Sequence, residues 1–290
     1  MKRFLAAFMV LALTLALLTG CGGPIEITLG SVDSNASKPA ESSAGQDSAP
    51  ESSGQADSGS SADNENSEAE ATPEPVVDNR TITEKYQDTA ASYKNVKGWS
   101  SIPNTYVDQA IVQSTDNAYY LDKNLAGGYY WYGSVFADYE NHVDSASGLD
   151  QNTVLFGHNK ADGLMFGNLT KYEGVSWAQN HPVIHTAFGG EEQDWLVIAA
   201  MDCETSFDYI KTYLSDADIQ NIRDRSYIDV DYSASSSDKF LTLSTCTYKY
   251  KLPSGKYRED VRFVVLAVLS NAGSATISSN GDRVEPSFGA

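Results

Sequence analysis

The chain has 290 residues and a formal net charge of −19, with 20 Lys and Arg against 39 Asp and Glu. A surplus of this sign is repelled by phosphate backbones, which argues against a nucleic-acid partner. All 17 Tyr and all 4 Trp lie from Tyr86 onward. The part that can form a core is therefore about 205 residues, enough for one substantial domain.

The first 20 residues have the pattern of an export signal. Lys2 and Arg3 precede an apolar run from Phe4 to Leu18 that is too short for a comfortable transmembrane helix. The following Leu-Thr-Gly-Cys21 resembles a bacterial lipobox, in which the cysteine is diacylated and becomes the mature N-terminus. We expect a lipoprotein-type signal over 1–20 and a lipid anchor at Cys21, on the extracytoplasmic face of the cell membrane. An uncleaved signal anchor is the alternative.

The next segment has the composition of an unfolded linker. Residues 31–80 hold 11 acidic residues against Lys38 and Arg80, and no aromatic residue. So little apolar surface cannot offset an ordering cost of about 1–2 kcal/mol per residue. We predict a disordered, acidic, Ser-rich tether over 21–78, a folded domain over 79–270 and a flexible C-terminal tail over 271–290.

The folded part begins with a helix and continues mainly as strands. Apolar residues at helical spacing predict a helix over Thr81–Tyr93, and Thr81 with Glu84 forms a capping-box pattern at its start. A second helical pattern covers Phe207–Arg225. Short apolar or alternating runs between turn signals predict a mostly antiparallel barrel or sandwich. The strands are expected at Ala110–Val112, Ser134–Ala137, Thr153–Phe156, Val183–Thr186, Trp195–Ala200, Phe240–Leu243 and Val261–Leu269.

Three predicted strand ends carry residues that could take part in catalysis. His158 follows an apolar run and Gly157, Cys246 ends the run from Phe240, and Arg262 opens a strongly apolar run. Each alone has an ordinary structural explanation, as a hydrogen-bonding His, a small buried Cys or a rim ion pair. Together they suggest acyl transfer, with a thiolate nucleophile, an imidazole to move its proton and a guanidinium for the oxyanion. The state of Cys203 is open as well: Cys203 and Cys246 either form a disulfide with each other or are both free thiols.

The Thr-Leu-Ser-Thr-Cys run at 242–246 resembles the signature of sortases, the cell-surface cysteine transpeptidases of Gram-positive bacteria. The order His158, Cys246, Arg262 is also that of the family. The resemblance is to class B and extends over about residues 79–270. Its motifs are Lys97-Gly-Trp99, Gln113-Ser-Thr-Asp-Asn-Ala-Tyr-Tyr-Leu121, Gly133-Ser-Val-Phe-Ala-Asp-Tyr139, Gly157-His-Asn159 and Met165-Phe-Gly-Asn-Leu169.

This resemblance implies a fold and a reaction. The fold is a closed eight-stranded β-barrel with an N-terminal helix and a helix between the sixth and seventh strands. Cys246 would cleave a Thr–Gly or Thr–Asn type bond in the C-terminal sorting signal of a surface protein, giving a thioester that a cell-wall or pilin amine resolves. His158 would be general acid and then base, and Arg262 would hold the substrate backbone and the oxyanion. Ser244 and Thr245 would contact substrate or only hydrogen-bond at the strand edge.

The sequence departs from the sortase pattern in two respects, and two other functions are alternatives to a sortase. Sortases commonly use a signal anchor rather than a lipoprotein signal, and the gap from Cys246 to Arg262 is long for class B, which leaves Arg258 as a competitor. A cell-wall Cys-His peptidase would place its Cys before its His in the sequence. A non-enzymatic lipoprotein binding module or adhesin would carry an inert Cys246. We expect no cofactor and no metal, because His142, His158, His181 and His185 have no metal-ligand spacing with the cysteines.

Overall fold

The computed structural model describes residues 78–270 and 275–286. The expected signal over 1–20, the lipid anchor at Cys21 and all but the last residue of the tether lie outside these ranges. The helices are α1 (Ile82–Ser92), α2 (Val175–Asn180) and α3 (Asp216–Arg225), with short 3-10 turns η1 (Tyr119–Leu121) and η2 (Leu169–Glu173). The strands are β1 (Val96–Ser101), β2 (Asp108–Val112), β3 (Val135–Ala137), β4 (Asn152–Phe156), β5 (Val183–Phe188), β6 (Glu191–Glu204), β7 (Ile228–Val230), β8 (Phe240–Cys246), β9 (Val261–Leu269) and β10 (Ile277–Ser279).

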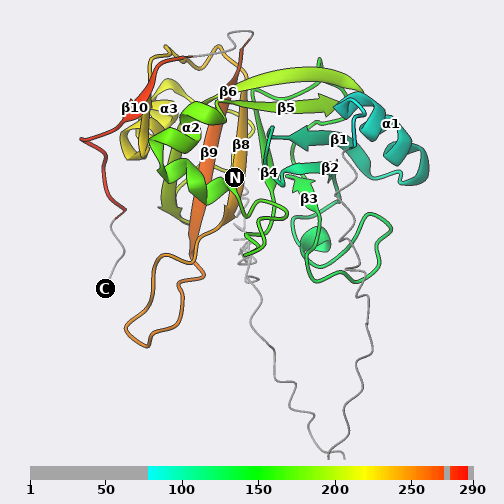
Figure 1. Ribbon diagram of the computed structural model, residues 1–290, viewed down its shortest axis with the longest axis horizontal. Coiled ribbons are helices and arrows are strands. Elements are labelled where there is room, and N and C mark those ends of the chain that lie inside the picture. Colours follow the sequence, from blue (N-terminus) through cyan, green and yellow to red (C-terminus); the bar gives the residue numbers. More distant parts are fainter. Residues whose placement is uncertain (1–77, 271–274, 287–290) are drawn as a thin grey trace, which may run out of the picture. The chain divides into compact units, whose positions relative to one another are not determined.

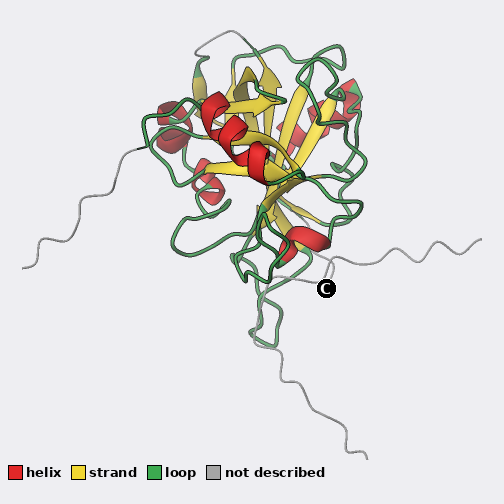
Figure 2. Cartoon of the chain, turned by 90° about the vertical axis from the view of Figure 1, so that its right-hand side faces the viewer, coloured by secondary structure: helices red, strands yellow, loops and turns green. Residues whose placement is uncertain are grey.

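Eight strands form a closed barrel in the order β1-β2-β3-β4-β8-β9-β6-β5, and the helices lie outside it (Figures 1 and 2). The β2–β3 and β4–β8 pairs are parallel, and the other pairs are antiparallel. The predicted closed, mostly antiparallel β-barrel is therefore confirmed. Because β4 and β8 run in the same direction and β9 runs back, β4 and β8 end at the rim where β9 begins.

Helix α1 confirms the capping-box prediction. The backbone N–H of Glu84 donates to the Thr81 hydroxyl (3.1 Å), and the backbone N–H of Thr81 donates to the Glu84 carboxylate (2.8 Å). The next residue, Lys85, is buried and forms an ion pair with Asp108 of β2 (2.6 Å). The helix is therefore fixed on the outside of the barrel by its cap and by this pair.

The second helical prediction is only half right. Helix α3 begins at Asp216, with Ser215 as its N-cap, and residues 207–215 are not helical. The backbone of this segment bonds to the start of β4 instead. The Asn152 N–H donates to the Thr212 carbonyl (2.9 Å), and the Asn152 side-chain amide donates to the Lys211 carbonyl (2.7 Å). Tertiary contacts thus replace the hydrogen bonds that a longer helix would have made.

Part of the segment expected as a flexible C-terminal tail is paired with the domain. Within 275–286, β10 pairs in antiparallel fashion with β7, and Ile277 is opposite Val230. Both of these side chains are buried, so apolar contact holds the segment to the domain. The described ranges hold no helix that combines the length and apolar character needed to cross a membrane.

Candidate active site

The ends of three adjacent strands bring His158, Cys246 and Arg262 together. In the parallel β4–β8 pair Phe156 is level with Ser244, so two residues further His158 is level with Cys246. Two hydrogen bonds continue this register, from the Gly157 N–H to the Ser244 carbonyl (3.2 Å) and from the Asn159 amide to the Cys246 carbonyl (2.8 Å).

On the other side of Cys246, the antiparallel β8–β9 pair sets Arg262 directly opposite the cysteine. Residues directly opposite in such a pair point to the same face of the sheet. The row therefore runs from imidazole to thiol to guanidinium across β4, β8 and β9. All three residues are partly exposed, so a substrate can approach this rim.

The imidazole of His158 is held by the β2–β3 loop. Its Nε2 lies 2.7 Å from the Leu121 carbonyl oxygen, which only accepts hydrogen bonds, so Nε2 carries a proton. The remaining nitrogen, Nδ1, is therefore the one that can exchange a proton with a reacting group. Burial lowers the pKa of His158 below its ordinary value, and the charges of Lys160 and Arg262 act in the same direction. The Leu121 carbonyl opposes this pKa shift without cancelling it.

The two candidate arginines differ in what holds them. Arg262 donates from one terminal nitrogen to the carbonyls of Glu259 (2.7 Å) and Val261 (3.0 Å), which orients the guanidinium at the strand end. Arg258 donates from two nitrogens to the carboxylate of Asp260 (2.9 and 2.6 Å). That bidentate pair raises the pKa of Arg258 and holds its guanidinium against the Asp260 carboxylate. The register places Arg262, not Arg258, opposite Cys246.

The hydroxyls of Ser244 and Thr245 point into the protein. Each residue is 2% exposed. Thr245 donates to the Gly157 carbonyl (2.7 Å), and Ser244 shares a hydrogen bond with the Tyr209 hydroxyl (2.8 Å). This geometry favours strand hydrogen bonding, one of the two roles that the sequence left open. The Thr245 bond also fixes the residue that precedes His158.

The second cysteine of the domain is buried on β6. Cys203 is a free thiol and lies opposite Arg262 on the far side of β9 from Cys246. Two strand spacings separate the cysteines, about 10 Å between Cα atoms, which is too far for a disulfide. Burial and the neighbouring Glu204 and Asp202 raise the pKa of the Cys203 thiol. Cys203 is thus a poor nucleophile, and a Cys203–Cys246 disulfide is excluded.

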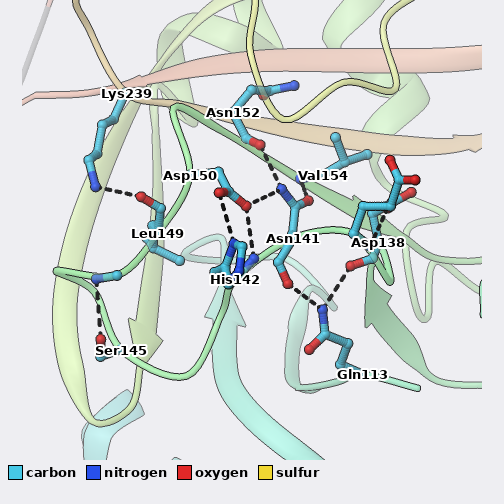
Figure 3. Close-up of polar contacts among 12 residues, drawn as sticks. Gln113, Asp138, Asn141, His142, Ser145, Leu149, Asp150, Asn152, Val154 and Lys239 are labelled. Atoms are coloured by element: carbon cyan, nitrogen blue, oxygen red, sulfur yellow. Dashed lines mark hydrogen bonds and ion pairs between the residues drawn. The ribbon is translucent and has the colours of Figure 1, made fainter. Parts of the chain in front are cut away.

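A polar network fixes the start of β4, the strand that leads to His158 (Figure 3). The Asn141 amide donates to the Asp150 carboxylate (3.0 Å) and the Asn152 carbonyl (2.9 Å), and its oxygen accepts from the Val154 N–H (2.8 Å). Gln113 donates to the backbone carbonyls of Asp138 (2.8 Å) and Asn141 (2.7 Å). The sequence analysis missed this role of Asn141, although Gln113 and Asp138 stand in the motifs of the resemblance. The network gives these motif residues a structural function.

Within the described ranges, no three His, Cys, Asp or Glu side chains are grouped so that they could hold a metal ion.

No family model matches the chain. The sequence is, however, 31% identical over 183 residues to sortase B of Listeria monocytogenes, a match that covers 61% of this chain and 73% of that protein. The chain belongs to the sortase B family. A second relative, sortase B of Staphylococcus aureus, is 29% identical over 162 residues, which cover 54% of this chain and 65% of the relative. The match thus spans slightly less than two thirds of the staphylococcal protein.

Solved sortase B structures share the fold. A Staphylococcus aureus sortase B–substrate complex has a TM-score of 0.56 and 25% identity and covers 66% of this chain and 87% of its own. A sortase B complexed with triglycine also has a TM-score of 0.56 and 25% identity, with coverage of 68% and 87%. Membership makes this chain a sortase B-like cysteine transpeptidase. This family assignment argues against both the Cys-His peptidase and the non-enzymatic adhesin.

Proposed function

We propose that this sortase cleaves a C-terminal sorting signal of a surface protein at a Thr–Gly or Thr–Asn type bond and transfers the acyl group to a cell-wall or pilin amine. Cys246 is the nucleophile, His158 the general acid and base, and Arg262 the oxyanion donor. The observation that carries this proposal is the row of these residues across the ends of β4, β8 and β9.

In the first half-reaction the Cys246 thiolate attacks the carbonyl carbon of the scissile bond. The negative charge moves to the carbonyl oxygen, where Arg262 stabilises it. Collapse of this intermediate breaks the C–N bond, and protonated His158 gives its Nδ1 proton to the leaving amine. The products are a thioester on Cys246 and a released C-terminal peptide.

In the second half-reaction an amine attacks the thioester. Neutral His158 takes the proton of the incoming amine, the C–S bond breaks, and the thiolate and the protonated imidazole are restored. The sortase B crystallised with triglycine supports a peptide amine as acceptor class. The substrate complex of staphylococcal sortase B supports a peptide as acyl donor.

Ser244 and Thr245 act in this scheme as positioning residues rather than substrate contacts. The Thr245 hydroxyl bonds the Gly157 carbonyl and so helps to keep the end of β8 in register with β4, while the Ser244 hydroxyl ties β8 to Tyr209 in the segment after β6. Loss of this register would separate the thiol from the imidazole.

The acyl-enzyme provides the direct test of this mechanism. The full chain, reduced and mixed with fluorogenic sorting-signal peptides, should form a peptide adduct on Cys246 that hydroxylamine or triglycine releases. Peptide mapping by mass spectrometry locates the adduct. An adduct on Cys203, or release of the C-terminal peptide with no dependence on Cys246, would contradict the assignment.

The proposed location is the extracytoplasmic face of the membrane, with diacylated Cys21 as anchor and residues 21–78 as tether. The support is the Leu-Thr-Gly-Cys sequence at 18–21. Intact mass of the membrane-extracted protein tests the anchor. A species that retains Met1 would favour the signal anchor instead.

A further inference from the structure

The connection between β8 and β9 is a projecting hairpin, residues 247–260, which we name the cationic arm. Its two sides pair through a bridge between Lys251 and Tyr257 and through the hydrogen bond from the Leu252 N–H to the Lys256 carbonyl (2.8 Å). Figure 1 shows this segment in orange, extending well beyond the ends of β8 and β9. The arm therefore starts directly after Cys246 and ends two residues before Arg262.

The charge of the arm is opposite to that of the chain. Its 14 residues carry four cations and two acids, a net of +2, in a chain of net −19. Two of these cations form ion pairs with carboxylates of the domain. Lys249 pairs with Glu173 outside the arm (3.2 Å), and Arg258 pairs with Asp260 at the end of the arm (2.6 Å). Lys251 and Lys256 are exposed and form no ion pair with the described residues. The distal half of the arm thus presents two cations that the domain itself does not neutralise.

The base of the arm is fixed to the barrel. Asp202 of β6 is only 1% exposed, and its carboxylate accepts hydrogen bonds from the hydroxyls of Tyr227 (2.5 Å) and Tyr250 (2.9 Å). Lys249 donates to the Tyr227 hydroxyl (2.7 Å) and so joins the same cluster. Because residues 249 and 250 are held in this way, the exposed part of the arm projects from a fixed base.

The arm also exposes apolar surface beside its cations. Tyr248, Leu252 and Tyr257 are 45%, 42% and 48% exposed. The rings of Tyr248 and Tyr257 meet edge to face at 5.7 Å, and the Lys251 ammonium lies 4.9 Å from the centre of the Tyr257 ring. Exposed aromatic surface next to a cation that the domain does not neutralise suits a peptide that carries acidic and apolar side chains.

The strand order indicates which part of the substrate passes the arm. β8 lies between β4 and β9. In the proposed reaction His158, on the β4 side, serves the leaving amine, and Arg262, on the β9 side, serves the acyl group. The arm joins Cys246 to Arg262, so it stands on the acyl side of the scissile bond.

We propose that the cationic arm binds acidic residues of the surface-protein substrate on the N-terminal, acyl side of the sorting motif. Lys251 and Lys256 pair with the carboxylates, while Tyr248, Leu252 and Tyr257 pack against neighbouring apolar side chains. The inference rests on the proposed function, because it takes the sorting signal as the acyl donor. Each contact is exposed, so the arm contributes to KM and leaves the chemical step unchanged.

The test uses two labelled sorting-signal peptides that differ only in the flank before the motif, one with Asp and Glu and one with Asn and Gln. The wild-type chain should bind the acidic peptide about five- to tenfold more tightly, as measured by fluorescence anisotropy, and high salt should remove this preference. The double variant Lys251→Glu with Lys256→Glu should lose the preference, with kcat on the neutral peptide unchanged. The matched control is Lys94→Glu, an exposed lysine between α1 and β1.

The outcomes separate this proposal from the function itself. Equal binding of both peptides by the wild-type chain, or the same loss for both in the double variant, would overturn the cationic arm as a binding site. A rise in the KM of the amine acceptor instead of the peptide would assign the arm to the acceptor and so overturn the proposal too. Selective binding of the acidic peptide without cleavage would support the arm and contradict the proposed reaction. The Lys251→Gln, Lys256→Gln variant, with its thermal melting curve, controls for misfolding.

Discussion

The two strands that flank β9 each carry a cysteine opposite Arg262, and these two cysteines differ in burial. On β6, Cys203 is fully buried and its thiol pKa is raised. On β8, Cys246 is the last residue of the strand and is partly exposed. Both face the same arginine in the same register row. The two positions in this row therefore differ in how far the neighbouring chain covers them.

Tyr209, in the segment that follows β6, lies near Cys203, which contributes to the raised pKa of the Tyr209 hydroxyl after burial. Tyr209, in this segment, is itself buried, and its hydroxyl reaches Ser244 on β8 (2.8 Å). Ser244 is two residues before Cys246 and shares its face of β8, since side chains on the same face of a strand recur every two positions. Tyr209 thus lies near Cys203 and Ser244, whereas Cys246, the last residue of β8, is partly exposed.

The largest effect expected from this comparison is on the nucleophile. Cys246→Ala should lower peptide cleavage and transfer by at least about 10³-fold, because no other group can form the thioester. The fold should remain, since a thiol at a strand end loses little packing. Steady-state cleavage and a thermal melt measure the two parts, and a variant that retains full activity would end the proposed mechanism.

The arginine end of the row gives the next effect. A positioned oxyanion donor contributes roughly 10²–10³ in rate, and Lys keeps the charge but not the planar fork. Arg262→Lys should therefore lower kcat at least about tenfold, whereas Arg258→Lys should stay near wild type. The reverse result would transfer the oxyanion role to Arg258.

The buried cysteine should matter for stability and not for turnover. Cys203→Ala removes one buried, methyl-sized group and should cost about 1 kcal/mol of unfolding free energy. Denaturant unfolding measures this loss, and cleavage kinetics should show an unchanged kcat. In the reduced wild-type protein a small methanethiosulfonate reagent should label Cys246 and spare Cys203. Preferential labelling of Cys203 would show that the structure around this buried residue opens in solution.

The smallest effect concerns the imidazole end of the row. Lys160 is one of the charges that lower the pKa of His158, so Lys160→Gln should raise that pKa by a fraction of a unit. An NMR titration of the ring protons measures this shift. The folded-state pKa of His158 lies below 6.5, so the unfolded chain binds more protons as pH falls through that value. This histidine therefore makes the fold less stable below about pH 6.5, and stability that improved on acidification through this range would contradict the direction of the pKa shift.

Local patterns in the sequence were sufficient for much of the architecture. The capping box at Thr81 and Glu84 gave α1, and short alternating runs gave seven of the eight barrel strands. The missed strand is β1, where Lys97 and Gly98 weaken the strand pattern. The placement of His158, Cys246 and Arg262 at strand ends was also visible in the sequence, because each follows, ends or opens an apolar run.

Tertiary structure decided the features that depend on distant partners. Residues 207–215 have a helical pattern, but their carbonyls accept hydrogen bonds from Asn152 of β4, so only α3 is helical. Ile277 becomes part of a strand because Val230 offers a buried partner. The same holds for the burial of the two cysteines, Cys203 and Cys246. Cys203 is buried within the core cluster and Cys246 is partly exposed at the end of β8, because burial is a property of neighbours that are distant in sequence.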